Sequence, residues 1–429
     1  MNLQMLSRRD LLKLGAAGAT VTSLSACATL GGKPLGRVVV VGGGYGGATA
    51  AKYLRLWSEG RIDVTLVEPN ENFVSCPISN LILGGSKQIG DITLPYSGLA
   101  KYGVRVVRDS ATAIDVDKKQ VRLAKGDPLP FDRVVLSPGI EFMYENVRGI
   151  TAADAQAVPH AWKAGPQTLL LRRQLEAMSD GGTVVMNVPL APYRCPPGPY
   201  ERACQIASYL KAAKPRAKLL VLDANPEMVS KRPLFTAVFS NDYKGIIEYR
   251  NNAAVTEVDV RGRAFVQDLG ERTVGDVLNF IPPQRAGNIA RDAGVITANN
   301  RWCEVDWMTM ESVKVKGVHV LGDATLSAPL MPKSGHMANQ HGKAAAAAIV
   351  ELMNGRAPAA PMMANTCYSF ISDALAIHVA SVHRYVPEKK TMEVVQGASG
   401  VSAADRKDWP LEAKYAWSWA QTIWADMLA

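Results

Sequence analysis

The sequence predicts an α/β protein with two Rossmann-like dinucleotide-binding domains and a small C-terminal α+β domain. Two strand–loop–helix units predict the first two domains: one begins at residue 38 and has a glycine-rich turn, and one begins at residue 181 and has a proline-rich loop. A later buried strand, residues 318–321, ends in a Gly-Asp turn that belongs to the first domain. The expected domain ranges are 29–145 and 270–355 for the first domain, 146–269 for the second and 356–429 for the C-terminal domain.

The first unit has the features of a dinucleotide-binding fold. Residues 38–41 are an unbroken β-branched run, as expected of a strand buried on both faces of a parallel sheet. Gly42, Gly44 and Gly47 follow in G-x-G-x-x-G spacing and lead into a helical pattern over residues 48–57. Such glycines let the backbone approach a pyrophosphate, and the helix N-terminus presents unpaired N–H groups to it.

An acidic residue completes this unit. The next strand, residues 63–67, ends at Glu68, about 20 residues beyond the glycines, where a carboxylate can bind ribose hydroxyls. Because a lone glycine motif is often only a tight turn, the order of strand, turn, helix and acid carries the prediction. Later in the chain, Gly322 and Asp323 are expected to face the ribityl and pyrophosphate groups of a flavin. The helix expected over residues 335–353 would direct its positive N-terminal dipole at the flavin.

The second unit keeps this architecture without the glycine motif. Its strand, residues 183–188, is followed by several prolines and Cys195, and no glycine lies where a phosphate would need close backbone approach. We therefore expect a Rossmann-like domain that binds no nicotinamide nucleotide and instead holds Cys195. The chain is expected to return to the first domain near residues 276–283, and residues 104–123 indicate a β-meander inserted in the first sheet.

The composition and net charge of the chain indicate which classes of function are not expected. The chain has 429 residues, of which 48% are hydrophobic and 20% charged, as is ordinary for a globular protein of two or three domains. Its net charge is +9, but no run of Lys and Arg is interleaved with aromatic residues, so nucleic-acid binding is not indicated. No stretch is long enough to predict a transmembrane segment.

Residues 1–28 predict an export signal and are kept out of the fold. The stretch SRRDLLK, residues 7–13, matches the twin-arginine signal, and Ala26-Cys27-Ala28 fits a small-x-small cleavage site. The preceding residues also fit a lipoprotein signal that would leave Cys27 lipidated, and simple cleavage is favoured. We expect a periplasmic protein that is exported in the folded state, in a compartment that permits disulfides.

Several segments resemble the flavoprotein subunit of flavocytochrome c sulfide dehydrogenase, a family of glutathione-reductase-like flavoproteins close to sulfide:quinone reductases. The matching segments include VVVVGGGYGGATAAKYL, PHAWKAG, YRCPPGPYER, IPPQRAG, GDA, MPKSG, NTCYS and YAWSW. CPPGPYER and IPPQRAG are long and unusual, which makes the resemblance specific. Residues 227–249 depart from it, because they are shorter and differently composed than the family leads us to expect.

The resemblance implies roles for particular residues. In the family, FAD is held by a thioether from a cysteine to the flavin 8-methyl carbon, and Cys76 occupies that position. Cys195 and Cys367 match the pair that forms a redox disulfide beside the flavin, and Glu201 matches an acid/base candidate. Lys333, in the MPKSG segment, joins the expected cofactor-binding residues.

The resemblance also implies a function. Sulfide is expected to be oxidised to elemental sulfur or polysulfide, with the electrons passing through FAD to a c-type cytochrome subunit. Sulfide would attack the disulfide of Cys195 and Cys367, and the released thiolate would reduce the flavin. The chain has no C-x-x-C-H motif, so any haem must come from a second polypeptide.

The residues alone leave alternatives open. Cys195 and Cys367 could form a structural disulfide, as most exported cysteine pairs do, and Cys76 could be a buried thiol. Glu201 could serve only to order its loop. The chain could also be a sulfide:quinone reductase-like enzyme or a non-catalytic flavin electron carrier, whereas a nicotinamide-linked reductase is disfavoured by the missing second glycine motif.

Aromatic residues crowd the end of the C-terminal domain, namely Trp409, Tyr415, Trp417, Trp419 and Trp424. Because aromatic side chains are enriched at protein interfaces, some of them are expected to face the cytochrome subunit. The alternative is that they only pack the C-terminal domain against the first domain. Cys204 and Cys303 have no assigned role and are expected to be structural thiols.

Overall fold

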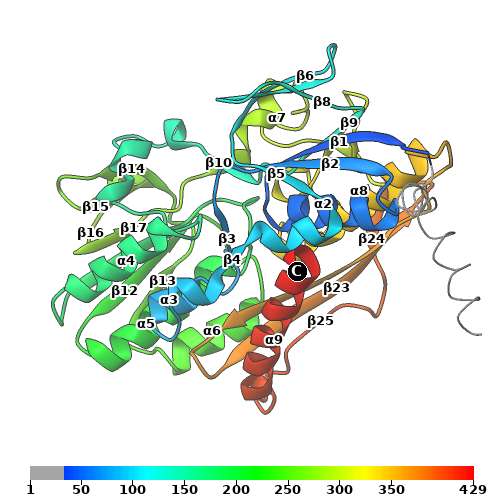
Figure 1. Ribbon diagram of the computed structural model, residues 1–429. Helices are drawn as coiled ribbons and strands as arrows, with labels where there is room; N and C mark the ends of the chain where they lie inside the picture. Colours follow the sequence, from blue (N-terminus) through cyan, green and yellow to red (C-terminus); the bar gives the residue numbers. More distant parts are fainter. Residues whose placement is uncertain (1–32) are drawn as a thin grey trace, which may run out of the picture.

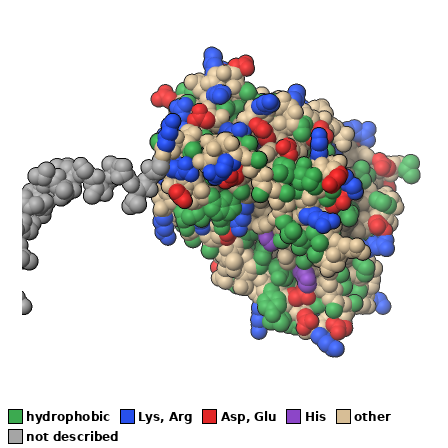
Figure 2. All heavy atoms as spheres, turned by 90° about the vertical axis from the view of Figure 1, so that its right-hand side faces the viewer, with side chains coloured by type: hydrophobic (Ala, Val, Ile, Leu, Met, Phe, Trp, Pro, Cys, Tyr) green, Lys and Arg blue, Asp and Glu red, His purple; other side chains and the backbone are tan. Residues whose placement is uncertain are grey.

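The computed structural model describes residues 33–429, which form three domains (Figure 1). The predicted export signal, residues 1–28 with Cys27, lies outside the described residues. Within the described range, no helix is long and apolar enough to cross a membrane. On the face that Figure 2 shows, basic and acidic side chains are interspersed, and hydrophobic side chains gather in patches between them.

A seven-stranded sheet, in the order β19-β20-β21-β9-β1-β2-β5, forms the core of the first domain. The central strand β1 (Gly36–Val41) pairs in parallel with β2 (Ile62–Val67) and β9 (Arg133–Leu136). β21 (Val318–Val320) lies parallel to β9 on the other side. Because these strands run the same way, the glycine turn after β1 and the Gly-Asp turn after β21 meet at one edge of the sheet.

Two helices pack together over this sheet. α2 (Tyr45–Trp57) follows the glycine turn and packs along α8 (Gly335–Met353), whose bounds are those expected from the sequence. The expected meander is partly wrong, because β5 (Arg105–Val107) is the edge strand of the main sheet and pairs in parallel with β2. A separate antiparallel sheet contains β6 (Ala111–Asp115), β7 (Gln120–Leu123) and β8 (Leu129–Pro130).

The second domain is built on a four-stranded parallel sheet in the order β13-β12-β11-β17. Its strands are β11 (Thr183–Val188), β12 (Lys218–Asp223), β13 (Ile247–Arg250) and β17 (Val277–Asn279). Its helices are α4 (Pro166–Ala177), α5 (Gly198–Ala213) and α6 (Arg232–Asn241). A small antiparallel sheet contains β14 (Val255–Asp259), β15 (Ala264–Gln267) and β16 (Arg272–Val274).

The expected boundary between residues 269 and 270 is wrong, because the second domain continues through β17. That strand pairs in parallel with β11, so it belongs to the second sheet rather than the first. The chain re-enters the first domain at β18 (Gln284–Ala286), which pairs antiparallel with β10 (Ile140–Phe142), the strand by which it leaves. All three residues of β17 are buried, and a short buried strand suits either parallel sheet, so its pairing partner decides its domain.

The C-terminal domain is an antiparallel sheet with a helix packed across it. Its elements are β22 (Met362–Phe370), β23 (Ala376–Val386), β24 (Thr391–Val394), β25 (Gly400–Val401) and α9 (Trp409–Leu428). The end of α9 docks on α2, where Lys52 Nζ donates to the main-chain oxygen of Ala429 at 2.6 Å. Trp424 Nε1 also donates to Tyr45 OH, at 3.0 Å, beside the glycine turn. These bonds hold the C-terminal domain against the first domain.

Some of the C-terminal aromatic residues are buried, and others are partly or largely exposed. Trp409 and Trp424 are only 2% and 3% exposed, so packing accounts for these two. Tyr415 is 51% exposed, and Trp417 and Trp419 are half-buried. The exposed tyrosine and the two half-buried tryptophans are therefore the members of this group that a partner could contact.

Short elements complete the described part of the chain. They are β3 (Asn72–Val74), β4 (Thr93–Pro95), β19 (Val305–Asp306), β20 (Glu311–Ser312), α3 (Asn80–Gly84) and α7 (Asn288–Asp292). Of these, α3 matters most for the site, because it packs against α5 of the second domain and follows directly after Cys76 and its neighbours.

Candidate functional site

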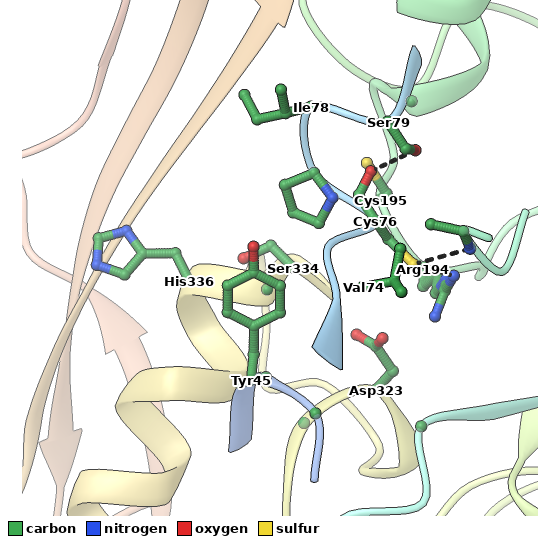
Figure 3. Close-up of a pocket in the computed structure, with 18 of the residues that line it drawn as sticks. Tyr45, Val74, Cys76, Ile78, Ser79, Arg194, Cys195, Asp323, Ser334 and His336 are labelled. Carbon is green, nitrogen blue, oxygen red and sulfur yellow. Dashed lines mark hydrogen bonds between the residues drawn. The ribbon is translucent and has the colours of Figure 1, made fainter. Parts of the chain in front are cut away.

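A cavity of about 380 Å³ lies where the three domains meet, at the carboxyl edge of the first sheet. Its walls include Gly44, Glu68, Cys76 and Asp323 of the first domain, Arg194 and Cys195 of the second, and Cys367 of the C-terminal domain. Figure 3 shows Asp323 beneath the Cys76–Arg194 contact, with Tyr45 and His336 on the opposite side. The fold thus brings together predicted site residues from segments far apart in the sequence.

Two positions of the glycine turn admit no side chain. Gly42 has a φ of +98°, in the left-handed region, and a Cβ on Gly47 would lie 1.8 Å from the Gly42 main-chain oxygen. At Gly44, by contrast, a Cβ would meet no protein atom within 4 Å, because this glycine borders the cavity. α2 begins at Tyr45 and has no side-chain cap, so its first N–H groups are available to a phosphate in the cavity.

Two carboxylates flank the turn. Glu68 is 7% exposed, and its Oε2 accepts a hydrogen bond from Gly43 N at 2.8 Å. Asp323 Oδ1 is buried and has no hydrogen-bond partner. Burial raises the pKa of Asp323, while the charges of Arg194 and Lys333 oppose that rise. A buried acceptor at a cavity wall calls for a donor from a ligand, such as a hydroxyl group.

These features fit FAD. The open space beside Gly44 leaves room for a pyrophosphate to approach the backbone, and Glu68 stands at the end of β2, where a carboxylate binds ribose hydroxyls. The unpartnered oxygen of Asp323 can accept a hydrogen bond from a ribityl hydroxyl. One cavity is therefore lined by six of the predicted cofactor-binding residues, namely Gly44, Glu68, Cys76, Gly322, Asp323 and Lys333, with the chemistry that a flavin nucleotide needs. Gly42 and Gly47 do not line it but shape the turn.

The N-terminus of α8 also faces this cavity. Ser334 caps the helix, with its Oγ accepting from Met337 N at 3.0 Å, and Gly335 and His336 line the cavity. His336 Nδ1 accepts from Thr366 N at 3.0 Å, and burial lowers the pKa of His336, so the ring is neutral at neutral pH. The positive end of the α8 dipole is thus directed at the cavity, as expected from the sequence.

Lys333 positions the Gly-Asp turn. Its Nζ donates to the main-chain oxygens of Asp323, at 3.1 Å, and Thr325, and it lies 3.9 Å from the centre of the Trp302 ring. Burial lowers the pKa of Lys333 to about 8. Lys333 therefore holds the loop that carries Asp323, and its part in cofactor binding stays a prediction.

Cys76 lies on the cavity wall beside Arg194. Its Sγ accepts from Arg194 Nη2 at 3.0 Å and from Ala164 N at 3.4 Å, and Ser79 Oγ donates to its main-chain oxygen at 2.6 Å (Figure 3). Cys76 is half-buried and borders the cavity, so the alternative of a thiol enclosed in the core does not describe it.

Cys195 is held in a strained conformation just before α5. Its φ is +55°, in the left-handed region that is uncommon for a residue with a side chain. Its N–H donates to the Lys333 carbonyl at 2.7 Å, a bond that ties the second domain to the first. A Cβ on Gly198 would lie 2.8 Å from Cys195 Sγ, so the first residue of α5 must be small. Burial raises the pKa of the Cys195 thiol far above its ordinary value.

Cys367 lies on β22 and lines the same cavity as Cys195. Its Sγ is 3.5 Å from Asn365 Oδ1, to which it donates. The five cysteines of residues 33–429 are all free thiols in this structure, so the disulfide between Cys195 and Cys367 stays a prediction. Cys204 and Cys303 are fully buried in the core, as expected of structural thiols.

Glu201 joins three elements at the cavity wall. It lies in the first turn of α5, and its two oxygens accept from Phe370 N of β22 and from Asn80 Nδ2 of α3, each at 2.9 Å. Arg202 Nε donates to the same asparagine at 3.2 Å. Burial raises the pKa of Glu201. This geometry gives Glu201 a structural role, and its place in the cavity lining keeps the acid/base prediction open.

Sequence reasoning missed Lys231 and Trp162. Lys231 Nζ donates to the Cys367 main-chain oxygen at 2.8 Å, and Trp162 lines the cavity with its buried Nε1 unpartnered. Lys231 falls in the segment 227–249, whose composition departs from the family. That departure is the feature of the sequence that could have drawn attention to Lys231. Trp162 stands in the PHAWKAG segment, which the resemblance includes without implying a role.

Three family models match parts of the chain. Residues 168–282 match the central part of the sulfide dehydrogenase [flavocytochrome c] flavoprotein chain, and residues 359–428 match the flavin-binding part of flavocytochrome c sulphide dehydrogenase. Residues 36–170 match the pyridine nucleotide-disulphide oxidoreductase model. A 46-residue stretch, 11% of this chain, is 63% identical to the corresponding flavoprotein chain of Chlorobaculum thiosulfatiphilum and covers 94% of that sequence.

Longer but more distant matches show the same fold. The mitochondrial sulfide:quinone oxidoreductase of Dictyostelium discoideum is 23% identical over 68% of this chain, which spans 66% of that relative's length. The sulfide:quinone oxidoreductase structure from Aquifex aeolicus has a TM-score of 0.69 at 18% identity and covers 91% of both chains. The putidaredoxin reductase–putidaredoxin complex gives 0.64 at 18% identity, over 90% of this chain and 94% of that one. The predicted fold class is confirmed.

Proposed function

Because the chain belongs to the family of flavocytochrome c sulfide dehydrogenase flavoprotein chains, we propose that it oxidises sulfide with bound FAD and passes the electrons to a c-type cytochrome subunit. One observation carries this proposal. Cys195 and Cys367, from two different domains, line the cavity whose other walls are the glycine turn and Asp323. A structural disulfide has no need to lie beside a cofactor site, whereas a redox disulfide must.

The sulfur chemistry takes place at the two cysteines. In the oxidised pair, hydrosulfide attacks one sulfur of the disulfide; a new S–S bond forms as a persulfide, the old one breaks, and the second cysteine leaves as a thiolate. A second sulfur nucleophile then takes the terminal sulfur of the persulfide, giving polysulfide or elemental sulfur. The two electrons that sulfide loses remain on the cysteine pair, which must be reoxidised for another cycle.

The other residues bind and orient the cofactor. FAD, when bound, accepts two electrons and releases them one at a time, which suits a haem acceptor. The glycine turn and Glu68 hold the nucleotide end, Asp323 offers an acceptor for the ribityl chain, and the α8 N-terminus places positive potential at the opposite wall. Cys76 supplies a sulfur at the cavity wall, where Arg194 Nη2 donates a hydrogen bond to it.

Covalent attachment of the flavin at Cys76 gives a direct prediction. Acid precipitation of the purified protein should leave the yellow colour on the polypeptide, because a thioether survives denaturation. Cys76→Ala should release all of the flavin into the supernatant while the chain still folds. Cys204→Ala is the matched control, because Cys204 is buried away from the cavity and should leave the flavin attached. Fully extractable flavin in the wild type would exclude the thioether.

The partner and the compartment follow from the same proposal. The chain supplies no C-x-x-C-H motif, so the haem belongs to a separate cytochrome subunit. Export through the twin-arginine signal would place both subunits in the periplasm after the flavin is taken up. Of the aromatic side chains on α9, those available to that subunit are the exposed Tyr415 and the half-buried Trp417 and Trp419.

The proposed function is tested by anaerobic stopped-flow mixing of the oxidised, flavin-loaded protein with sulfide and, separately, with NADH. Sulfide should bleach the flavin, and NADH should do so no faster than buffer, because the loop after β11 lacks a phosphate-binding glycine turn. Steady-state assays with a c-type cytochrome and with a soluble quinone separate the proposed acceptor from that of the sulfide:quinone oxidoreductases. Failure of sulfide to bleach the flavin would overturn the proposal, and preferential quinone reduction would replace its acceptor.

A further inference from the structure

Lys231 reaches from the second domain to the strand that carries Cys367. It stands directly before α6, with a φ of +52°, and is only 7% exposed. Its Nζ donates to the Cys367 main-chain oxygen at 2.8 Å, to Ser369 Oγ at 2.9 Å and to the Ile377 main-chain oxygen at 3.5 Å. All three donors of the ammonium are therefore used on β22 and β23, and none of these acceptors is charged.

A buried ammonium without a charged partner is costly, and that cost favours the neutral amine. Burial accordingly lowers the pKa of Lys231 to about 8, against the opposing effects of Cys367, Glu201, Cys195 and Glu412, in decreasing order. Neither carboxylate is hydrogen-bonded to Lys231. The Glu412 carboxylate is hydrogen-bonded to His378 and Ser402. The Glu201 carboxylate is hydrogen-bonded to Phe370 N and Asn80.

The two thiols respond differently to this charge. Burial raises the pKa of the Cys367 thiol, and Lys231 is the largest opposing effect, followed by Asn365 and Ser334, with Glu201 adding to the rise. For the Cys195 thiol, Cys367 and Glu201 add to the rise caused by burial, and Arg194 acts against it before Lys231 does. The Lys231 ammonium is therefore the main group that opposes the pKa rise of Cys367, whereas Arg194 takes that place for Cys195.

We propose that Lys231 is a positioning residue for the sulfur chemistry: it fixes the Cys367 strand by three hydrogen bonds and places beside Cys367 the positive charge that stabilises its thiolate. The inference rests on the proposed function, because it states which sulfur carries the negative charge after hydrosulfide has opened the disulfide. When hydrosulfide bonds to Cys195 Sγ, the disulfide breaks and its electron pair goes to Cys367 Sγ. A stabilised thiolate leaves faster, so Lys231 favours this direction of opening.

The sign of the pH effect follows. The reactive form of Cys367 is the thiolate, so its reactivity rises as the pH passes through the thiol pKa. The charge on Lys231 lowers that pKa while the lysine is protonated, which holds up to its own pKa of about 8. Removing the charge should therefore slow the thiol below pH 8, where a pKa difference of about one unit makes it about tenfold less reactive. Above pH 8 the effect should fade, because Lys231 is then neutral in the parent protein as well.

The test measures the thiol itself rather than turnover. Cys195→Ser in the flavin-loaded protein leaves Cys367 as the reporter, and its reaction with methyl methanethiosulfonate is followed from pH 6 to 10 by peptide-resolved mass spectrometry. Adding Lys231→Met should slow the modification of Cys367 about tenfold at neutral pH, and this difference should shrink above pH 8. Lys231→Arg should retain most of the parent rate, and Ser369→Ala, which keeps the ammonium, should behave like the parent.

Two outcomes overturn the inference: an unchanged rate of Cys367 modification at neutral pH in folded Lys231→Met, or the same slowing in Lys231→Arg. Should Lys231→Met fail to fold, Lys231→Gln is compared with Lys231→Arg instead, because both retain a hydrogen-bond donor and only one keeps the charge. Because the reagent needs no sulfide, a protein that ignores sulfide but shows the slowing contradicts the proposed function alone. A protein that turns over sulfide without the slowing contradicts the role of Lys231 alone.

Discussion

Replacing Cys195 or Cys367 with serine is expected to reduce sulfide-dependent bleaching of the flavin to the rate of a buffer control. Either change removes one sulfur of the bond that hydrosulfide attacks, and a serine hydroxyl can neither form a disulfide nor leave as a thiolate. The flavin should remain bound in both variants, because its proposed attachment is at Cys76. The measurement is anaerobic stopped-flow absorbance after mixing each folded variant with sulfide, alongside flavin content after acid precipitation.

The comparison separates a redox pair from a structural disulfide. Loss of a structural disulfide lowers stability by about 2–5 kcal/mol but leaves properly folded enzyme active. Cys303→Ser serves as a control, because Cys303 is fully buried and lies outside the cavity wall, so its loss should affect stability rather than the reaction. Retained sulfide turnover in folded Cys195→Ser or Cys367→Ser would remove the central step of the mechanism.

The sequence predicted the first domain well because its signals are local. The β-branched run, the glycine spacing and Glu68 form one continuous segment, and α8 has both a serine cap and a clear start at Gly335. Each of these features depends on residues that lie close together in the sequence. The resemblance then added the cysteines, and the fold brings them to one cavity although the chain alone gives no distance between them.

The predictions that failed concern contacts between residues that lie far apart in the sequence. β17 is short and buried throughout, so its residues suit the first sheet as well as the second, and its pairing with β11 settles the matter. β5 lies close in sequence to the β6–β8 sheet but pairs with β2. Lys231 was overlooked for the same reason, because nothing near it in the sequence shows that its partners are on β22 and β23.

Glu201 shows the limit of carrying a role over from a family. Its sequence position matches an acid/base candidate, and the structure places it in the cavity lining. Both of its oxygens, however, accept hydrogen bonds that join α3, α5 and β22. A group bound in this way has a structural task whatever its part in proton transfer, so loss of activity on its replacement would not by itself identify an acid or base.

Gly47→Ala is expected to abolish flavin binding and to destabilise the first domain strongly. The new Cβ would lie 1.8 Å from the Gly42 main-chain oxygen, a separation that forces the start of α2 away from β1. Because backbone rather than a flexible side chain is in the way, we expect a loss of about 4 kcal/mol or more, in the exceptional range for a single substitution. Thermal denaturation followed by circular dichroism gives the stability, and the ratio of flavin to protein absorbance gives the occupancy.

Two other glycines make the result specific. At Gly44 a Cβ meets no protein atom within 4 Å and the φ of −70° suits any residue, so Gly44→Ala should fold with nearly parental stability. Its methyl group would nevertheless occupy the place where the pyrophosphate approaches the backbone, so flavin content should fall. Gly90→Ala, at an exposed position with open space around it, should change neither property. If Gly44→Ala retained full flavin while Gly47→Ala lost it only by unfolding, the cofactor would lie elsewhere in the cavity and the proposed placement of its phosphates would be wrong.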